Sequence, residues 1–350
     1  MTAPFHFTPR TDMACQAWDA LADASDEAWL WHRYDFQEAL ETWPGSSDES
    51  FAVTAPDEQQ PLALVPLRRI TRRVAGVVPV HILESFGGAA LRNGLGEKRR
   101  RAVLSAVREE LVTRARTGTC VEIRMALPPM APALRGARCP RVSPLLDMGC
   151  DNTLTQTWVV DLGIGRDAVW KQMEGRARTA VRKAEKAGVT VREARADDLD
   201  TYHRLREETH RRTGVPPNTQ TKDYFRVIWE RFLSVGLSRV WVAELNGEPV
   251  AAENFAIYKQ AGIYWTGAAS ARGLEVEANS LLQWTAMQWM LENGIEWYET
   301  GEASPQVNAG KLKGISDFKK SFGGTMYPYY KGRVRTGTVW ERLYRCMRDN

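Results

Sequence analysis

The sequence has 350 residues, of which 43% are hydrophobic and 26% are charged. This composition is typical of a globular protein, and the length exceeds that of one hydrophobic core, so we expect two domains of about 150 residues. The apolar runs are much shorter than the ~18 residues of a membrane span, and the first residues lack the pattern of a secretory signal. We therefore expect a cytoplasmic protein without a membrane span.

The cysteines are odd in number and widely spaced: Cys15, Cys120, Cys139, Cys150 and Cys346. This pattern argues against a disulfide framework and against a zinc site, so we expect reduced, structural thiols. Motifs for a metalloprotease, a P-loop, a dinucleotide-binding loop and a serine-hydrolase elbow are missing from the sequence. The sequence therefore gives no sign of a metal or of one of these cofactors.

The formal net charge is only +4, but the basic residues are clustered along the chain. The clusters are Arg68-Arg69, Arg72-Arg73, residues 98–101, residues 176–186, and a tail with Lys331, Arg333 and Arg335. Such patches attract polyanions through counterion release, which favours nucleic acid or a nucleotide-linked substrate as a partner. Solvated helix faces are the alternative explanation of such clusters.

The first half predicts a mixture of helices and strands. We expect helices over 15–21 and 26–42, a β-hairpin of strands 51–55 and 61–67, an apolar strand or loop over 77–86, and a helix over 97–117 that leads into a strand over 120–124. Residues 126–156 contain five prolines and lack helical or strand periodicity. The crossing between the two domains is therefore expected there.

The second half predicts the same kinds of element. We expect a strand over 158–162, a helix over 166–187, a strand over 189–192, helices over 197–213 and 224–233, and a three-stranded meander over 239–267. Residues 51–67 and 240–257 share a pattern of strand, polar turn, proline and strand. In both halves a helix that ends in glycine, Gly118 or Gly294, then leads into a strand. A duplicated α/β unit is therefore predicted.

A candidate functional site lies near the end of the second half. Its sequence is Lys313-Gly-Ile-Ser-Asp-Phe318-Lys319-Lys-Ser-Phe322-Gly323-Gly324. Phe318 and Phe322 are spaced i, i+4 and predict a short helix with both rings in a core, which leaves Lys319 on a different face. The two glycines end this helix, because glycine adopts positive φ without steric cost. The alternative is an amphipathic helix with solvated lysines.

The basic segment over 176–186 also has two faces when it is drawn as a helix. One face carries Arg176, Arg178, Arg182, Lys183 and Lys186, and the opposite face carries Ala177, Ala180, Val181, Ala184 and Ala187. This arrangement predicts one packed side and one side that faces a polyanion. A solvated basic face is again the alternative.

Together with the basic helix, the Phe-Lys-x-x-Phe-Gly-Gly run resembles the Fem family of aminoacyl-tRNA-dependent peptidyltransferases and their GNAT-like acyltransferase relatives. Further matching stretches are Thr209-x-x-Arg212-x-Gly214, Leu245-Asn-Gly-Glu-Pro249, Asn279-Ser-Leu-Leu-Gln-Trp284 and Gly294-Ile-Glu-Trp-Tyr298-Glu-Thr-Gly301. The match covers residues 155–330 well and the first half loosely. It implies an α/β fold with mixed sheets and two tandem GNAT-like domains (the acyl-CoA N-acyltransferase fold), 1–150 and 151–350, the second with a C-terminal extension.

The resemblance also implies an activity and roles for residues. The activity is transfer of an aminoacyl group from aminoacyl-tRNA, as co-substrate, to the amine of a peptide or small molecule, without a cofactor or metal. Phe318 and Lys319 map onto the pair at the tRNA acceptor stem and at the developing charge. Arg212 is a candidate for binding an anionic group of the acceptor, against pairing with the helix dipole. Candidates for orienting the amine are Glu253, Glu299 and Glu302, with solvated glutamates as the alternative. Candidates for lining an aminoacyl or adenine pocket are Trp265 and Trp284, with a place in the core as the alternative.

The chain departs from the related families at two points. Where acetyl-CoA-binding domains have a glycine-rich pyrophosphate loop, this chain has Ser270-Ala-Arg272-Gly273-Leu-Glu275-Val-Glu277, whose carboxylates would repel a pyrophosphate. Where cell-wall enzymes have Asp-Pro, it reads Ile123-Arg-Met-Ala-Leu-Pro128, so a small amine or peptide is as well supported as a peptidoglycan precursor. An acyl-CoA- or acyl-carrier-dependent N-acyltransferase and a basic RNA-binding module remain the alternatives.

Overall fold

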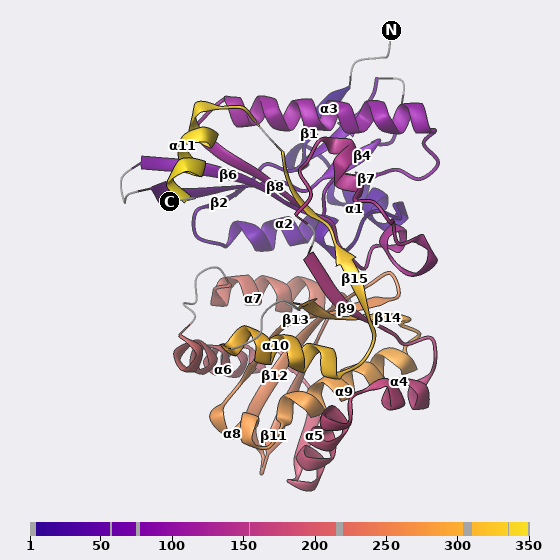
Figure 1. Ribbon diagram of the computed structural model, residues 1–350, viewed down its shortest axis with the longest axis vertical. Helices are drawn as coiled ribbons and strands as arrows, with labels where there is room; N and C mark the ends of the chain where they lie inside the picture. Colours follow the sequence, from indigo (N-terminus) through magenta and orange to yellow (C-terminus); the bar gives the residue numbers. More distant parts are fainter. Residues whose placement is uncertain are drawn as a thin grey trace. The chain divides into compact units, whose positions relative to one another are not determined.

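The structure is a computed structural model that describes residues 5–56, 58–74, 78–153, 155–214, 220–303, 310–334 and 336–348. The chain divides into two compact units, Met1–Leu154 with Tyr329–Asn350, and Thr155–Pro328 (Figure 1). The predicted domains, 1–150 and 151–350, differ from these units in the last part of the chain. The reason is that β16 (Lys331–Val334) pairs with β8 (Cys120–Ala126) of the first unit through backbone hydrogen bonds.

The first unit contains a mixed five-stranded sheet and an antiparallel four-stranded sheet. The five-stranded sheet has the order β16-β8-β6-β5-β2, with β2 at Ser46–Asp48, β5 at Arg68–Val74 and β6 at Val78–Phe86. The four-stranded sheet has the order β1-β3-β4-β7, with strands at His6–Pro9, Phe51–Thr54, Ala63–Val65 and Ala90–Leu91. The predicted hairpin is confirmed as β3 and β4, which pair antiparallel. Strand β5 was not predicted, because its four arginines indicate a charged segment rather than a strand.

The helices of the first unit are α1 (Cys15–Ala24), α2 (Tyr34–Glu41), α3 (Glu97–Arg116) and α11 (Val339–Arg348) among the described residues. Short 3-10 helices lie at Leu30–His32, Pro132–Leu134, Gly136–Arg138 and Pro144–Met148. Helix α3 confirms the prediction over 97–117. The predicted helix over 26–42 is shorter in the structure, because Arg33 has an extended backbone with ψ of 146° and separates the 3-10 turn from α2.

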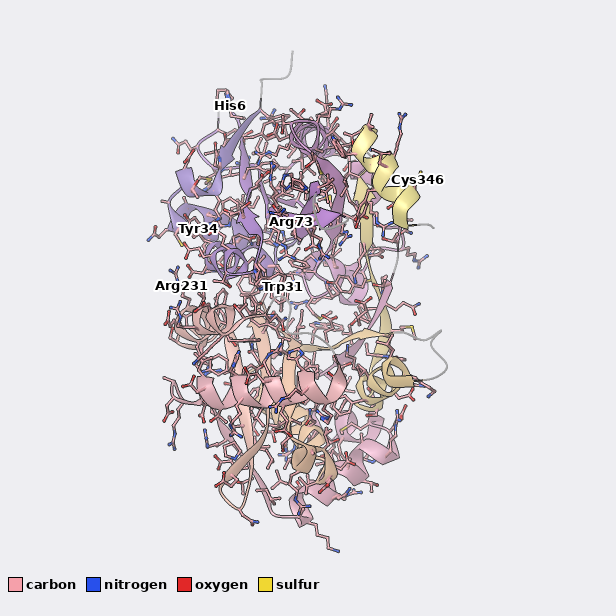
Figure 2. All side chains as sticks on the ribbon, turned by 90° about the vertical axis from the view of Figure 1, so that its left-hand side faces the viewer. His6, Trp31, Tyr34, Arg73, Arg231 and Cys346 are labelled. Atoms are coloured by element: carbon pink, nitrogen blue, oxygen red, sulfur yellow. The ribbon has the colours of Figure 1, made fainter. Side chains whose placement is uncertain are left out.

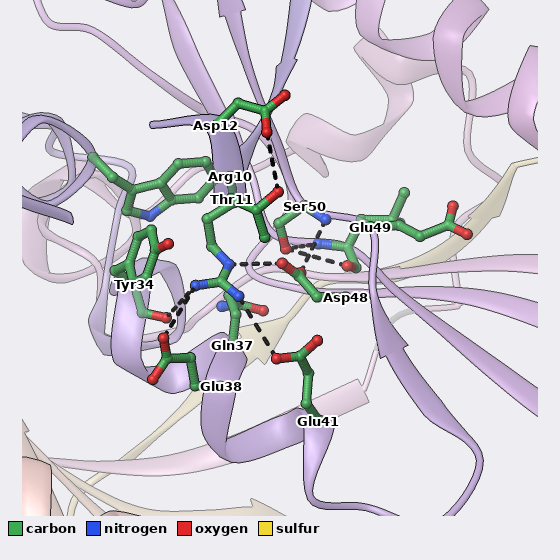
Figure 3. Close-up of polar contacts among 12 residues, drawn as sticks. Arg10, Thr11, Asp12, Tyr34, Gln37, Glu38, Glu41, Asp48, Glu49 and Ser50 are labelled. Carbon is green, nitrogen blue, oxygen red and sulfur yellow. Dashed lines mark hydrogen bonds and ion pairs between the residues drawn. The ribbon is translucent and has the colours of Figure 1, made fainter. Parts of the chain in front are cut away.

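The basic residue Arg10 of the first unit is buried and has partners within the fold. Arg10 is 2% exposed, its Nε donates to the Asp48 carboxylate at 2.7 Å, and its guanidinium lies 4.1 Å from the Tyr34 ring centroid. Glu38 and Glu41 lie 3.9 Å and 3.8 Å from its other nitrogens (Figure 3). The burial of this charge is compensated by carboxylates on α2 and β2, so Arg10 connects these elements instead of facing a ligand.

The second unit is built on a seven-stranded sheet in the order β10-β11-β12-β13-β14-β9-β15. Its strands are β9 (Thr155–Asp161), β10 (Val189–Glu193), β11 (Ser238–Leu245), β12 (Glu248–Tyr258), β13 (Ala261–Ala269), β14 (Trp297–Ala303) and β15 (Thr325–Tyr329). Strands β11, β12 and β13 pair antiparallel in sequence order, which confirms the predicted meander.

The helices that pack on this sheet are α4 (Arg166–Gln172), α5 (Gly175–Lys186), α6 (Asp198–Thr213), α7 (Lys222–Ile228), α8 (Ala271–Glu275), α9 (Ala278–Glu292) and α10 (Gly310–Ser321), with a π-helical turn at Trp229–Leu233. The single helix predicted over 166–187 is two helices. Met173 has an extended ψ of 141°, and this separates α4 from α5.

Both units contain a parallel strand pair joined through a long helix: β6, α3 and β8 in the first, and β13, α9 and β14 in the second. This confirms the helix-to-strand part of the predicted repeat. The hairpin part is not equivalent in the two units, because β3 and β4 lie in a sheet separate from β8, whereas residues 240–257 lie in the same sheet as β14. Within the described residues none of the five cysteines forms a disulfide, and Cys346 is exposed on α11 (Figure 2), so it has no buried structural role. Within the described ranges, no helix has both the length and the apolar character needed to cross a bilayer.

Candidate active site

The parallel strands of the second unit separate before they end. Strands β13 and β14 pair only at Ala261–Trp297, Gly262–Tyr298 and Ile263–Glu299, although β13 continues to Ala269 and β14 to Ala303. Register shifts lie at the same level, between Glu299 and Gly301 on β14 and at Trp265 on β13. Such bulges bend strands and redirect side chains. The polar residues beyond the last pair are therefore the first place to look for chemistry.

Lys319 contacts β14 at this bulge. Its Nζ donates to the Glu302 carbonyl at 3.1 Å, and the Thr300 hydroxyl donates to the Lys319 carbonyl at 3.3 Å. A Cβ placed on Gly301, which has φ of +107°, would lie 2.7 Å from Lys319 Nζ. Only glycine therefore allows this approach without strain. Two stretches that are far apart in the sequence, 297–301 and 318–324, meet here.

Helix α10 is anchored largely as its sequence predicts. The Phe322 ring is fully buried, the Phe318 ring is half-buried against the same core, and their centroids lie 4.9 Å apart. Gly323 and Gly324 have φ of +89° and +87°, so the helix ends where two residues with positive φ follow it. Phe318 is therefore less completely enclosed than Phe322.

Glu253 and Glu299 are both buried, but their surroundings differ. Glu299 on β14 is 4% exposed and accepts a hydrogen bond of 2.5 Å from the Thr157 hydroxyl. Glu253 on β12 is 0% exposed and accepts a hydrogen bond of 2.6 Å from Gln283 Nε2, and the Tyr298 hydroxyl donates to the other end of that amide. Burial raises the pKa of Glu253 well above its ordinary value, although hydrogen bonds from its neighbours oppose the shift.

A protonated Glu253 is a hydrogen-bond donor rather than a proton acceptor. Burial also raises the pKa of Tyr264 and of Tyr298 well above the ordinary value. This part of the second unit is therefore a neutral hydrogen-bonding network. It can hold β12, β14 and α9 in position, whereas a proton from an attacking amine needs another acceptor.

The basic helix α5 does not present one uniform basic face. Arg178 donates to the carbonyls of Lys171, at 3.1 Å, and of Met173, so it caps the end of α4. Arg176 donates to the Glu174 carboxylate at 2.7 Å and to the Asp317 carbonyl at 2.5 Å, which connects α5 to α10. These two arginines thus have partners within the fold.

The remaining basic residues of α5 are exposed. Arg182 lies 5.4 Å from the centroid of the Trp170 ring, and Lys183 lies 3.8 Å from the Glu277 carboxylate. Lys186 is also exposed. On the packed side, the predicted burial is confirmed for Ala177, Val181 and Ala184, whereas Ala180 is half-buried and Ala187 is exposed at the helix end.

Arg212 binds the backbone at the end of β13. Its Nη2 donates to the Ala269 carbonyl at 3.1 Å, and Thr209 exchanges two hydrogen bonds of 3.1 Å with the same residue. One turn earlier, the Glu208 carboxylate accepts from the Ala271 amide at 2.9 Å, while the Ser270 hydroxyl accepts from the Gly273 amide at 3.0 Å. Acetyl-CoA-binding domains have their pyrophosphate loop at the position of α8. In this protein, the Ala271 and Gly273 amides there donate to the Glu208 and Ser270 side chains instead.

The two tryptophan candidates lie in different surroundings. Trp284 is 6% exposed, belongs to the apolar core and lies 4.7 Å from the Trp170 ring. Trp265 is half-buried on the β13 bulge, with the Tyr224 and Phe232 rings 6.2 Å and 6.5 Å away. Trp284 thus has the environment of a core residue, and Trp265 is the better candidate for a pocket wall.

Sequence reasoning missed the partners of the buried acids. Thr157 donates to Glu299, Gln283 donates to Glu253, and Tyr298 donates to Gln283, while Glu208 accepts from the Ala271 amide. For Gln283 the sequence does contain a signal, because a polar residue stands there in the middle of a mostly apolar helix. For Thr157 no local signal existed, because its partner lies 142 residues away in the sequence.

Comparisons with known proteins agree with this architecture. Residues 171–320 match a family described as an acetyltransferase (GNAT) domain. A search of curated protein sequences finds no match. FemX shares 15% identity with a TM-score of 0.71, and the match covers 95% of this chain and 98% of FemX.

Two further solved structures have the same fold. A C-terminal domain described as that of a lysylphosphatidylglycerol synthetase from Agrobacterium fabrum is 14% identical, with a TM-score of 0.59 and 95% coverage of both chains. A tandem GNAT protein from the clavulanic acid biosynthesis pathway is 10% identical, with a TM-score of 0.51 and coverage of 96% of this chain and 100% of that chain.

These likenesses define the class of fold, a tandem GNAT-like acyltransferase fold over almost the whole chain. The predicted α/β fold with mixed sheets, and the predicted resemblance to Fem-like and GNAT-like proteins, are confirmed at this level. Within that class, the second unit is the part that carries the acetyltransferase (GNAT) domain match.

Proposed function

We propose that this protein is an N-acyltransferase that moves an aminoacyl group from aminoacyl-tRNA to the amine of a peptide or small molecule. The observation that carries this proposal is the position of Lys319 against Gly301 and Glu302, where β13 and β14 have separated. An ammonium group held at such an opening is suited to stabilise the oxyanion that develops during acyl transfer. The likeness to FemX supports the aminoacyl class of donor.

The chemistry requires little from the protein beyond positioning and charge stabilisation. The amine nitrogen attacks the ester carbonyl carbon, a C–N bond forms, and the bond from that carbon to the ribose oxygen breaks. The ribose oxygen takes up the proton that the nitrogen loses. In this scheme Lys319 faces the carbonyl oxygen, Phe318 contacts the donor, and Glu299, fixed by Thr157, orients the amine. Glu253 holds the strands in place.

The loop at α8 supports a donor other than acyl-CoA. Its Ala271 amide already binds the Glu208 carboxylate, and a pyrophosphate placed there would meet that negative charge. The exposed Arg182, Lys183 and Lys186 are suited to the phosphates of a tRNA. An acyl-CoA- or acyl-carrier-dependent N-acyltransferase is the second candidate, and the description of the matching family as an acetyltransferase domain is the observation that favours it.

The test combines purified protein with a pool of charged tRNAs carrying labelled amino acids and a cell extract as a source of acceptors. We expect a new amide detected by mass spectrometry that depends on charged tRNA and is lost with Lys319→Ala. A parallel reaction with acetyl-CoA replaces the tRNA. Product from that reaction alone would favour the second candidate, and tRNA binding without amide product from either donor would favour an RNA-binding module.

A further inference from the structure

The first unit contains an apolar cavity of about 150 Å³ next to a polar hollow of about 320 Å³. Glu27, Arg100 and Ala133 line both, so the two spaces meet at these residues. Arg100 comes from α3, the long helix of the first unit in Figure 1. All of these residues belong to the first unit, so the inference below does not depend on the acyl-transfer site proposed above.

The inner cavity is lined by large aliphatic side chains. Leu104, Leu127, Leu134, Leu145 and Met148 line it, and each is less than 10% exposed. An engineered apolar cavity of about 150 Å³ in another protein stays dry and binds benzene, which sets the scale of a suitable occupant at about six carbons. Packed protein interiors rarely contain voids of this size. A ring or short chain would therefore fit here.

The outer hollow has the opposite character. The Glu27 carboxylate accepts from the Leu91 amide at 3.1 Å and pairs with Arg100 at 2.5 Å, and Asp26 pairs with Arg138 at 2.7 Å. Arg92 and Arg99 share the Glu58 carboxylate. Three arginines, Arg92, Arg100 and Arg138, and two carboxylates, Glu27 and Asp26, thus line the hollow, and their ion pairs are partly exposed. Exposed pairs contribute little stability, so an anion can replace a carboxylate as the partner of an arginine.

We propose that these two spaces form one binding site for a short amphiphile with a carboxylate at one end. Its hydrocarbon part, about six carbons long, occupies the apolar cavity. Its carboxylate reaches Arg100 and takes the place of Glu27, because a guanidinium binds a carboxylate through two parallel hydrogen bonds. This assigns the first unit a ligand of its own, separate from the acyl donor.

The first experiment titrates the full-length protein with hexanoate and with hexanol in a calorimeter. Arg100→Gln should weaken hexanoate binding about tenfold and leave hexanol binding unchanged, since only the carboxylate uses that side chain. Glu27→Gln should strengthen hexanoate binding, because the competing charge is gone while an acceptor for the Leu91 amide is kept. Arg101→Gln is the matched control, as Arg101 is 76% exposed and pairs with Glu97. Acetate, which lacks the chain, should not bind.

The second experiment fills the cavity. Leu104→Phe, or Leu134→Phe where the first variant has a lowered melting temperature, should abolish binding of both hexanoate and hexanol. Equal hexanoate affinity in the wild type, Arg100→Gln and a folded cavity-filling variant would overturn the proposal. So would the absence of saturable hexanoate binding to the wild type at about 10 mM. These measurements need no acyl donor, so their failure would leave the proposed transfer reaction unaffected.

Discussion

The two units of this protein use the same parallel strand pair in different ways. In the first unit, β6 and β8 stay paired from His81–Cys120 to Phe86–Ala126, at the ends of both strands. In the second unit, β13 and β14 pair over three residues and then part. A closed pair leaves no room between its strands, whereas an open pair exposes backbone and side chains to a substrate.

The charged residues near the two parallel strand pairs also differ between the units. In the first unit, Glu84 pairs with Arg68 and Glu122 pairs with Arg124, so charges next to β6 and β8 are matched within the fold. In the second unit, Lys319 Nζ donates to the backbone carbonyl of Glu302 on β14. The match to the acetyltransferase (GNAT) domain also falls within 171–320. The comparison therefore favours the second unit as the location of the proposed transfer chemistry.

The anchoring of α10 holds Lys319 against β14, and the largest expected effect tests that anchor. Phe322→Ala removes a ring that is 0% exposed and should lower the free energy of unfolding by about 3–5 kcal/mol. Phe318→Ala should cost less stability, because this ring is half-buried. Urea unfolding of both variants measures the difference. Equal losses would show that both rings serve only as core, which removes Phe318 from the site.

The next largest effect concerns turnover. Lys319→Ala should leave the fold intact and lower kcat by about 10²–10³, the usual cost of removing one oxyanion donor. Lys320→Ala is the matched control, because that neighbouring lysine is exposed and lies 6.0 Å from the Trp158 ring. Rates with a saturating donor and acceptor measure the effect. Wild-type turnover in Lys319→Ala would mean that α10 only covers the sheet and that the proposed mechanism is wrong.

Much of this site could be predicted from local sequence pattern. The rest could not, and the reason is physical. The i, i+4 spacing of Phe318 and Phe322, followed by two glycines, specified a helix, its buried face and its end. The contact of Lys319 with Gly301 depends on where β14 lies in the sheet, and this is set by its pairing with β9 and β13. Sheet order is a long-range property, so no local pattern of charge or hydrophobicity contains it.

The basic residues of α5 show a second limit of prediction from sequence. Sequence spacing placed five cations on one face of the helix over 176–186. It could not show that Arg178 caps α4 or that Arg176 reaches α10, since both partners come from neighbouring elements. The break at Met173 creates the helix end that Arg178 caps. A charge cluster thus divided into structural and exposed members only once the packing was known.

A smaller effect should follow from the buried acid of the second unit. The pKa of Glu253 is raised in the folded protein, so between its unfolded value of 4.5 and the folded value only the unfolded chain releases this proton. The free energy of unfolding should therefore fall as pH rises through that window, by up to about 1.4 kcal/mol per pH unit. Glu253→Gln mimics the protonated acid and should remove this slope.

The measurement is urea unfolding of the wild type and Glu253→Gln between about pH 5 and about pH 8. Glu299→Gln provides a comparison on the neighbouring strand. Parallel pH profiles for the wild type and Glu253→Gln would contradict a raised pKa. Such a result would restore Glu253 as a candidate proton acceptor for the attacking amine, and would weaken the assignment of a purely positioning role.

The smallest expected effect separates the exposed from the structural cations of α5. Replacing Arg182, Lys183 and Lys186 by glutamine should raise the Kd for charged tRNA while the melting temperature stays unchanged, because these side chains are exposed. If all three contact phosphates, the slope of log Kd against log salt should fall by about 0.7–0.9 for each one. Arg178→Gln should instead lower the melting temperature, since it removes the cap of α4. A triple variant with the wild-type salt slope would exclude this helix from donor binding, and the donor would then have to be held by other parts of the chain.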